Sequence, residues 1–162
     1  MDKLPVDIAT PERIRLGGDD LTVLATSADT DGALFAVEIR MRPGGGPPVM
    51  HRHAPGEVYY VLEGEFTFYL GLGSDARRVT ATAGQTVPLA GNLPHAIRNE
   101  SDADAVAISV HAPGPPMENF SRAAAALAAE GEPDIEDVLA LAEKYGIEMM
   151  GPIPAPQAAS RT

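Results

Sequence analysis

Three side chains that lie close together in the sequence could form a metal-binding or acid–base group. They are His51, His53 and Glu57, within the segment Gly45–Gly64. The two histidines are separated by one residue on a segment with strand character, so their imidazoles are expected to face the same side, because strand side chains alternate. Ala54-Pro55-Gly56 has the composition of a turn, so Glu57 is predicted to begin a return strand beside the first. Neutral nitrogen and anionic oxygen donors in one small volume suit a first-row divalent metal ion.

A fourth donor is available in His95, in a second segment that is rich in turn residues. Together the three imidazoles and the carboxylate predict a site for one divalent transition metal. Fe, Mn, Ni, Cu and Zn all stay open, because the ligand types do not distinguish them. The competing interpretation is that the histidines are exposed strand or loop residues and that Glu57 is a surface carboxylate. His111 lies outside both segments and is interpreted as a strand-end residue that does not bind the metal.

Two further residues are predicted to line the same cavity and contact a substrate. Tyr59 has the same strand parity as Glu57, and Ile97 has the same parity as His95. Packing in the core without substrate contact is an equally good interpretation of Tyr59. The carboxylates near Asp134 are expected to form a solvated face at a helix N-terminus and not an acid–base pair.

The segments that would position these residues have the pattern of β-strands. Many short strands, separated by glycine-containing turns at about 8–12-residue spacing, predict an antiparallel sandwich or a small barrel. The strands 58–62 and 66–70 are predicted to pair as a hairpin through Glu63-Gly64-Glu65. The other predicted strands are 21–26, 35–41, 77–82, 85–89, 95–99 and 105–111, and a further short strand is predicted at 13–16.

The chain divides into a barrel and terminal segments. Residues 1–20 are expected to form an N-terminal arm, and residues 21–112 the barrel. Residues 113–150 are expected to form a helical extension, in which Asp134 caps the second helix and Gly146 ends it. Residues 151–162, which include three prolines in Pro152, Pro154 and Pro156, are predicted to be disordered.

Composition narrows the classes of partner. The chain has 162 residues, 44% of them hydrophobic, which favours one globular domain. Its formal charge of −11 argues against binding nucleic acid or an anionic membrane surface. The absence of cysteine excludes disulfides and thiolate ligands. Without a long apolar run or an apolar N-terminal segment, the protein is expected to be cytoplasmic and not a membrane protein.

The two histidine segments resemble the paired motifs of the cupin superfamily. The first cupin motif, G-x5-H-x-H-x3/4-E-x6-G, is matched by Gly45, His51, His53, Glu57 and Gly64. The second is matched by Gly84, His95 and Asn99, while Ala90 and Asn92 replace its proline and its second glycine. The resemblance covers roughly residues 20 to 112, and its departures fall on turn residues.

This resemblance implies an all-β cupin jelly-roll barrel with a short α-helical C-terminal extension. The four motif residues would be the metal ligands, and Glu57 could also act as a general base. The similarity to single-domain, quercetin-dioxygenase-like cupins implies a metal-dependent dioxygenase, an oxidoreductase acting on a small aromatic or enol substrate. It also implies a homodimer. Two alternatives stay open: a non-redox isomerase, cyclase or decarboxylase, and a non-catalytic small-molecule-binding protein. A nucleotide-sugar epimerase is less favoured, because no histidine–tyrosine arrangement of that kind is evident in the sequence.

Overall fold

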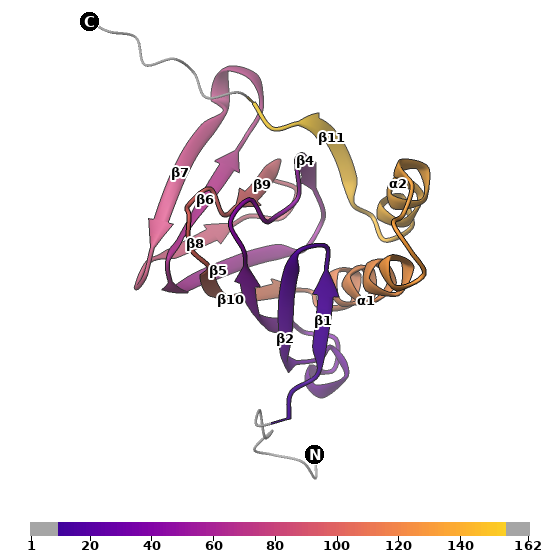
Figure 1. Ribbon diagram of the computed structural model, residues 1–162. Helices are drawn as coiled ribbons and strands as arrows, with labels where there is room; N and C mark the ends of the chain where they lie inside the picture. The colour runs from indigo at the N-terminus through magenta and orange to yellow at the C-terminus, as the bar shows by residue number, and fades with distance from the viewer. Residues whose placement is uncertain (1–9, 155–162) are drawn as a thin grey trace, which may run out of the picture.

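Two antiparallel β-sheets pack face to face and carry a pair of helices on one side (Figure 1). This is a computed structural model, and it describes residues 10–154. The six-stranded sheet has the order β1 (Arg13–Leu16), β2 (Asp19–Ala25), β3 (Phe35–Met41), β10 (Ala105–Ala112), β5 (Gly56–Glu63) and β8 (Thr86–Leu89). The five-stranded sheet has the order β11 (Glu148–Pro152), β4 (Val49–Arg52), β9 (His95–Arg98), β6 (Glu65–Leu70) and β7 (Arg77–Thr82). Short 3-10 helices span Ala28–Thr30 (η1) and Gly73–Asp75 (η2). The predicted all-β barrel is confirmed.

The main core lies between the two sheets. Phe66 and Phe68 on β6 are fully buried and meet Val61 of β5. Because side chains alternate along a strand, the strands that border this core give it every second side chain and leave the others for solvent or for a second layer. The core residues are Met41, Tyr59, Val61, Phe66, Phe68, Leu70, Ala81, Val87, Leu89, Ile97, Ala105 and Ala107.

The predicted hairpin of β5 and β6 is wrong. β5 pairs with β10 and β8, whereas β6 pairs with β7 and β9 in the opposite sheet. The chain crosses between the sheets at Gly64, which has a φ of 69° and would bring a Cβ to 2.8 Å from the Asp104 carbonyl oxygen. Because β5 and β6 lie in opposite sheets, Val61 and Phe66 enter the same core from opposite sides. They could not do so if β5 and β6 were paired in one sheet.

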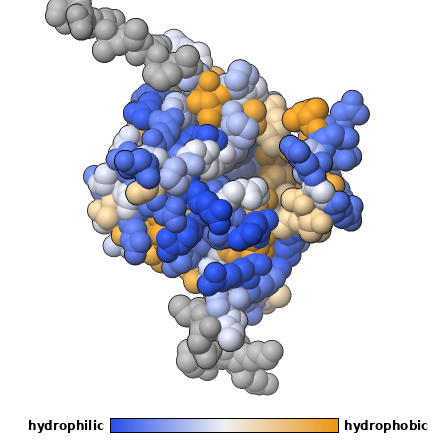
Figure 2. Space-filling view, in the orientation of Figure 1, coloured by the Kyte–Doolittle hydropathy of each residue, from blue (hydrophilic) through white to orange (hydrophobic). Residues whose placement is uncertain are grey.

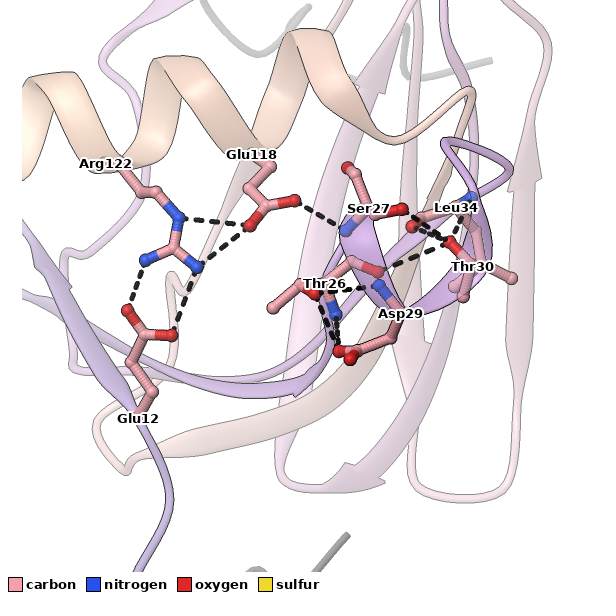
Figure 3. Close-up of polar contacts among 8 residues, drawn as sticks. All are labelled: Glu12, Thr26, Ser27, Asp29, Thr30, Leu34, Glu118 and Arg122. Atoms are coloured by element: carbon pink, nitrogen blue, oxygen red, sulfur yellow. Dashed lines mark hydrogen bonds and ion pairs between the residues drawn. The ribbon is translucent and has the colours of Figure 1, made fainter. Parts of the chain in front are cut away.

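Helix α1 (Pro115–Ala129) is fastened to the edge of the six-stranded sheet (Figure 3). The Arg122 guanidinium donates to Glu118 Oε1 at 2.9 Å and to Glu12 Oε2 at 3.1 Å. Glu118 also accepts a hydrogen bond from the Ser27 backbone N–H at 2.6 Å. Beneath the helix, Met117 and Ala125 pack on a second apolar cluster made of Ile14, Leu21, Val23, Phe35 and Val37. The C-terminal helices therefore begin from a fixed point on the barrel.

Helix α2 (Ile135–Lys144) has the predicted cap and stop. The Asp134 carboxylate accepts from the Asp137 N–H at 2.9 Å, and Gly146 takes a left-handed φ of 74° just after the helix. Ile135 and Leu139 remain 68% and 45% exposed, and Figure 2 shows apolar side chains among the polar surface on this side. No helix within residues 10–154 is long and apolar enough to cross a membrane.

Strand β11 was not predicted from the sequence, which assigned its first half to the helical extension and its second half to a disordered tail. The structure places Glu148–Pro152 as a fifth strand beside β4 (Figure 1). The remainder of the predicted tail, residues 155–162, and the first part of the predicted arm, residues 1–9, lie outside the described residues.

Candidate metal centre

Three imidazoles converge inside the barrel. His51 lies on β4, His53 just after that strand, and His95 at the start of β9. One ring nitrogen from each lies within 4.8 Å of the others, which is close enough for a single metal ion. The register explains part of this convergence, because His51 and His95 are directly paired across β4 and β9. Their ring centroids are 4.4 Å apart.

Each imidazole is oriented by a backbone carbonyl two residues away. The Nδ1 atom of His95 lies 2.7 Å from the Leu93 oxygen, and that of His53 lies 3.0 Å from the Pro55 oxygen. The corresponding contact of His51, with the Val49 oxygen, is longer at 3.4 Å. A carbonyl accepts only, so Nδ1 carries a proton, and in the neutral imidazole Nε2 presents a lone pair. Second contacts of this kind orient histidines that bind metals.

Glu57 faces the three imidazoles from the neighbouring sheet, although it lies outside the group of ring nitrogens within 4.8 Å of one another. Its Oε1 atom lies 2.6 Å from His53 Nε2 and 3.1 Å from His95 Nε2, and the carboxylate is buried. These contacts are short, yet their directions do not satisfy hydrogen-bond geometry, and the atoms involved have no other hydrogen-bond partner within the described residues. When the imidazoles are neutral and protonated on Nδ1, an Nε2 lone pair faces a carboxylate oxygen, and this arrangement is unfavourable unless a cation or a proton lies between them. The donors therefore fit a divalent metal.

The electrostatics of the group favour the ligating forms of His51 and Glu57 but the protonated form of His95. Burial, together with the nearby His95, lowers the pKa of His51 to about 4, so this imidazole is neutral at pH 7. Burial alone would raise the pKa of Glu57, but contact with His53 and His95 holds it well below its usual value. Burial likewise works against the charged form of His95, yet the Glu57 carboxylate outweighs it and raises the pKa of His95. Glu57 is thus an anion beside imidazoles.

Metal binding is expected to release a proton from His95 near neutral pH. Ligation requires the neutral imidazole, and the metal-free protein holds a proton on His95 up to a pH above the ordinary value of 6.5. Metal affinity should therefore rise as the pH rises through that raised pKa. Calorimetric titration with Co(II), in buffers of different ionisation enthalpy, should show more protons released at about pH 6.5 than at about pH 8.5. Equal release at both pH values would contradict this assignment.

The two residues predicted to contact a substrate lie next to the donors, within the buried core. Tyr59 is 6% exposed, Ile97 is 5% exposed, and both belong to the cluster between the sheets. The Tyr59 ring packs edge-on against Phe68, with centroids 5.4 Å apart. Burial and the adjacent Glu57 carboxylate raise the pKa of Tyr59 well above its usual value, so its hydroxyl stays protonated.

His111 lies closer to the centre than the sequence interpretation implied. It stays outside the three-histidine group, but its Nδ1 atom is 3.6 Å from Glu57 Oε2, because His111 and Glu57 are directly paired across β10 and β5. Its Nε2 atom lies 3.0 Å from Ser109 Oγ. The rings of His111 and Tyr59 are 6.5 Å apart, a proximity that the sequence did not reveal. The sequence held one signal of it: Ser109 and His111 are two residues apart on a strand, so their side chains face the same side.

The departures from the second cupin motif are accommodated locally. Asn92 adopts a left-handed φ of 63°, a conformation that asparagine tolerates better than most residues, so it can take the place of the motif's glycine. Asn99 is fully buried, and its side-chain nitrogen donates to the carbonyls of Met41 and Ala103. Asn99 therefore ties the end of β3 to the loop before β10.

Comparison with known proteins agrees with this architecture. Residues 37–111 match the family described as Cupin domain. A cupin described as RmlC-like from Shewanella frigidimarina is similar in structure, with 24% identity, a TM-score of 0.54, and coverage of 65% of this chain and 86% of that one. A cupin-superfamily sugar phosphate isomerase from Silicibacter pomeroyi has 17% identity, a TM-score of 0.55, and coverage of 65% and 73%.

A third similar structure is the oxalate decarboxylase of Bacillus subtilis, a protein with Mn(II) centers. It has 19% identity and a TM-score of 0.58, with coverage of 69% of this chain and 30% of that one. No curated protein matches the chain in sequence. At these identities the structural likeness establishes the fold. Together with the family match and the paired motifs, it leads to one conclusion: residues 37–111 are similar to the cupin domain family, and the chain has the cupin fold.

Proposed function

We propose that this protein is a metal-dependent enzyme that acts on a small substrate bound through oxygen atoms. One observation carries the proposal: three imidazole nitrogens and a buried carboxylate converge, and the Nε2 atoms of His53 and His95 and both Glu57 oxygens lack hydrogen-bond partners among the described residues. We propose His51, His53, His95 and Glu57 as the ligands. A divalent ion held there would polarise substrate oxygens and offer positions for the substrate and, if redox-active, for O2.

Glu57 is proposed to act as the general base. It is ionised at neutral pH, buried, and near the imidazoles, so a substrate hydroxyl entering the site would meet an oxygen able to take its proton. Tyr59 and Ile97 are proposed to contact the apolar part of the substrate and to exclude water. An aromatic or enol substrate suits these surroundings, because it offers a flat apolar body and acidic oxygens.

The reaction we propose first is oxygenation of such a substrate, as the resemblance to quercetin-dioxygenase-like cupins implies. A second candidate is a non-redox reaction, such as an isomerisation or a decarboxylation. It is favoured by the placement of Tyr59 beside Glu57, where the protonated hydroxyl would supply a proton donor as well as the carboxylate base, with the His111 ring 6.5 Å from that of Tyr59. The structural likeness to a sugar phosphate isomerase and an oxalate decarboxylase is compatible with it.

Oxygen uptake distinguishes these candidates. The full-length protein, loaded separately with Mn(II), Fe(II) and Ni(II), would be mixed with a flavonol or a catechol in an oxygen-electrode cell. Substrate-dependent O2 consumption, lost in folded His51→Ala, supports the dioxygenase. Substrate conversion without O2 uptake supports the non-redox enzyme. Saturable binding of the substrate without conversion would leave a binding protein.

We also propose a homodimer formed through the outer face of the six-stranded sheet. On β5 the inward Glu57 and Tyr59 alternate with Val58 and Tyr60, which are 38% and 43% exposed. A second copy of the chain packed on this face would bury these side chains. Light scattering is expected to give twice the 16.9 kDa mass of one chain, and a mass of one chain would contradict the proposal.

A further inference from the structure

The strand that carries His51 is held weakly by the barrel itself. β4 pairs with β9 at one position, His51 with His95. The loop after it adds one backbone hydrogen bond, in which the His53 oxygen accepts from the Asn92 N–H at 2.7 Å. Without a partner on its other side, β4 would be an exposed edge strand.

The C-terminal strand β11 supplies that partner. Glu148 pairs with Arg52, Met149 with His51, and Pro152 with Val49. β11 follows the two helices and lies outside the matched cupin domain, residues 37–111. In Figure 1 it runs beside β4 at the edge of the five-stranded sheet. More of β4 is therefore paired with the C-terminal extension than with the cupin domain.

Side chains fix β11 in this place at both of its ends. The Glu148 carboxylate accepts from Arg52 Nε at 2.8 Å and lies 2.7 Å from Arg52 Nη2. Met150 and Ile153 pack on a buried cluster formed by Met50, Tyr69 and Ala96 on the outer side of the five-stranded sheet. Just before the strand, Ile147 is 4% exposed and donates its N–H to the Ala142 oxygen of α2 at 2.9 Å.

His51 depends on this support more than the other two imidazoles do. Its contact with a backbone carbonyl, at 3.4 Å, is the longest of the three, and its side chain is only half-buried, whereas His53 and His95 are buried. Placement of the His51 ring therefore rests on the backbone of β4. Small displacements of a ligand weaken a metal site, because geometry and ligand orientation contribute to affinity.

We propose that β11 is a positioning strand for the metal centre, with Met150 and Glu148 acting through β4 on His51. The proposal rests on the metal site put forward above. It assigns a role to the helical extension, which would connect the edge of the six-stranded sheet, where α1 packs, to β4, which carries His51. A purely structural role would also lower stability on disruption, but it would leave the metal affinity of the folded protein unchanged.

The first test replaces Met150 by aspartate in the full-length protein, placing a carboxylate against Met50 and Tyr69. Co(II) is the probe, followed by calorimetry and by its visible absorption. We expect the dissociation constant to rise about tenfold and the absorption to change, as loss of a supporting contact typically causes. The control is Leu139→Asp, which also replaces an apolar side chain by a carboxylate but at an exposed position of α2. It should alter neither the dissociation constant for Co(II) nor the absorption.

A milder second test reverses a charge. Glu148→Arg places a second positive charge beside Arg52 and is expected to weaken Co(II) binding. The double variant Arg52→Glu/Glu148→Arg pairs opposite charges again and should restore most of the binding. A readout without metal is the rate at which diethyl pyrocarbonate modifies His51, which should increase in Met150→Asp and in Glu148→Arg. Folded single variants with wild-type cobalt affinity and wild-type His51 reactivity would overturn the proposal. If the wild type binds no Co(II) while the reactivity of His51 still changes, the proposed metal function fails and the positioning of His51 by β11 stands.

Discussion

His95→Gln is expected to remove bound metal from the protein. His95 is the one imidazole supplied by the second cupin motif, and its Nε2 atom faces both the other histidines and Glu57. Glutamine fills a similar volume but offers a weak amide donor in place of a nitrogen lone pair. Since supporting contacts around a metal are worth about 10–100-fold in affinity, loss of a ligand should cost at least about 100-fold. Elemental analysis and Co(II) calorimetry would measure the loss.

His111→Asn is the matched control for that experiment. His111 is also buried and also faces Glu57, but it lies outside the three-histidine group. Its replacement should keep the metal content at the level of the wild type. If His95→Gln binds cobalt as tightly as the wild type does, the proposed ligand set is incorrect. Circular dichroism of both variants would show whether the barrel remains folded.

Glu57→Gln is expected to separate metal binding from turnover. The amide keeps the shape of the side chain but cannot accept a proton as a carboxylate does. Three imidazoles remain to hold the ion, so the variant should still bind metal when the metal is supplied at saturating concentration, although with a weaker affinity than the wild type. The catalytic rate should fall about 10²–10⁴-fold, the usual contribution of a general base. Steady-state kinetics on whichever substrate supports turnover, with metal content measured on the same sample, would test this.

Glu63→Gln provides the control on the same strand. Glu63 is exposed at the end of β5, so its replacement should leave both the metal content and the rate unchanged. A Glu57→Gln variant that keeps its metal and turns over at the wild-type rate would show that the carboxylate is not the base. A variant that loses its metal as completely as His95→Gln would show that Glu57 serves mainly as a ligand.

Local sequence patterns predicted much of the fold. The alternation of apolar and polar residues located most strands of the barrel, and Asp134 and Gly146 marked the ends of the second helix, because capping depends on residues a few positions apart. The hairpin prediction for β5 and β6 failed. Alternation shows that a strand has an apolar face, but it does not show which sheet the strand joins.

The candidate site, like the fold, was predicted only in part from the sequence. The sequence by itself predicted the proposed donor set, because the spacing of His51, His53 and Glu57 and the separate His95 segment are properties of the chain alone. Only the tertiary structure decided that His111 reaches Glu57 and that β11 pairs with β4. Both contacts join residues far apart in the chain, and their register is set by the packing of whole sheets, which no local pattern encodes.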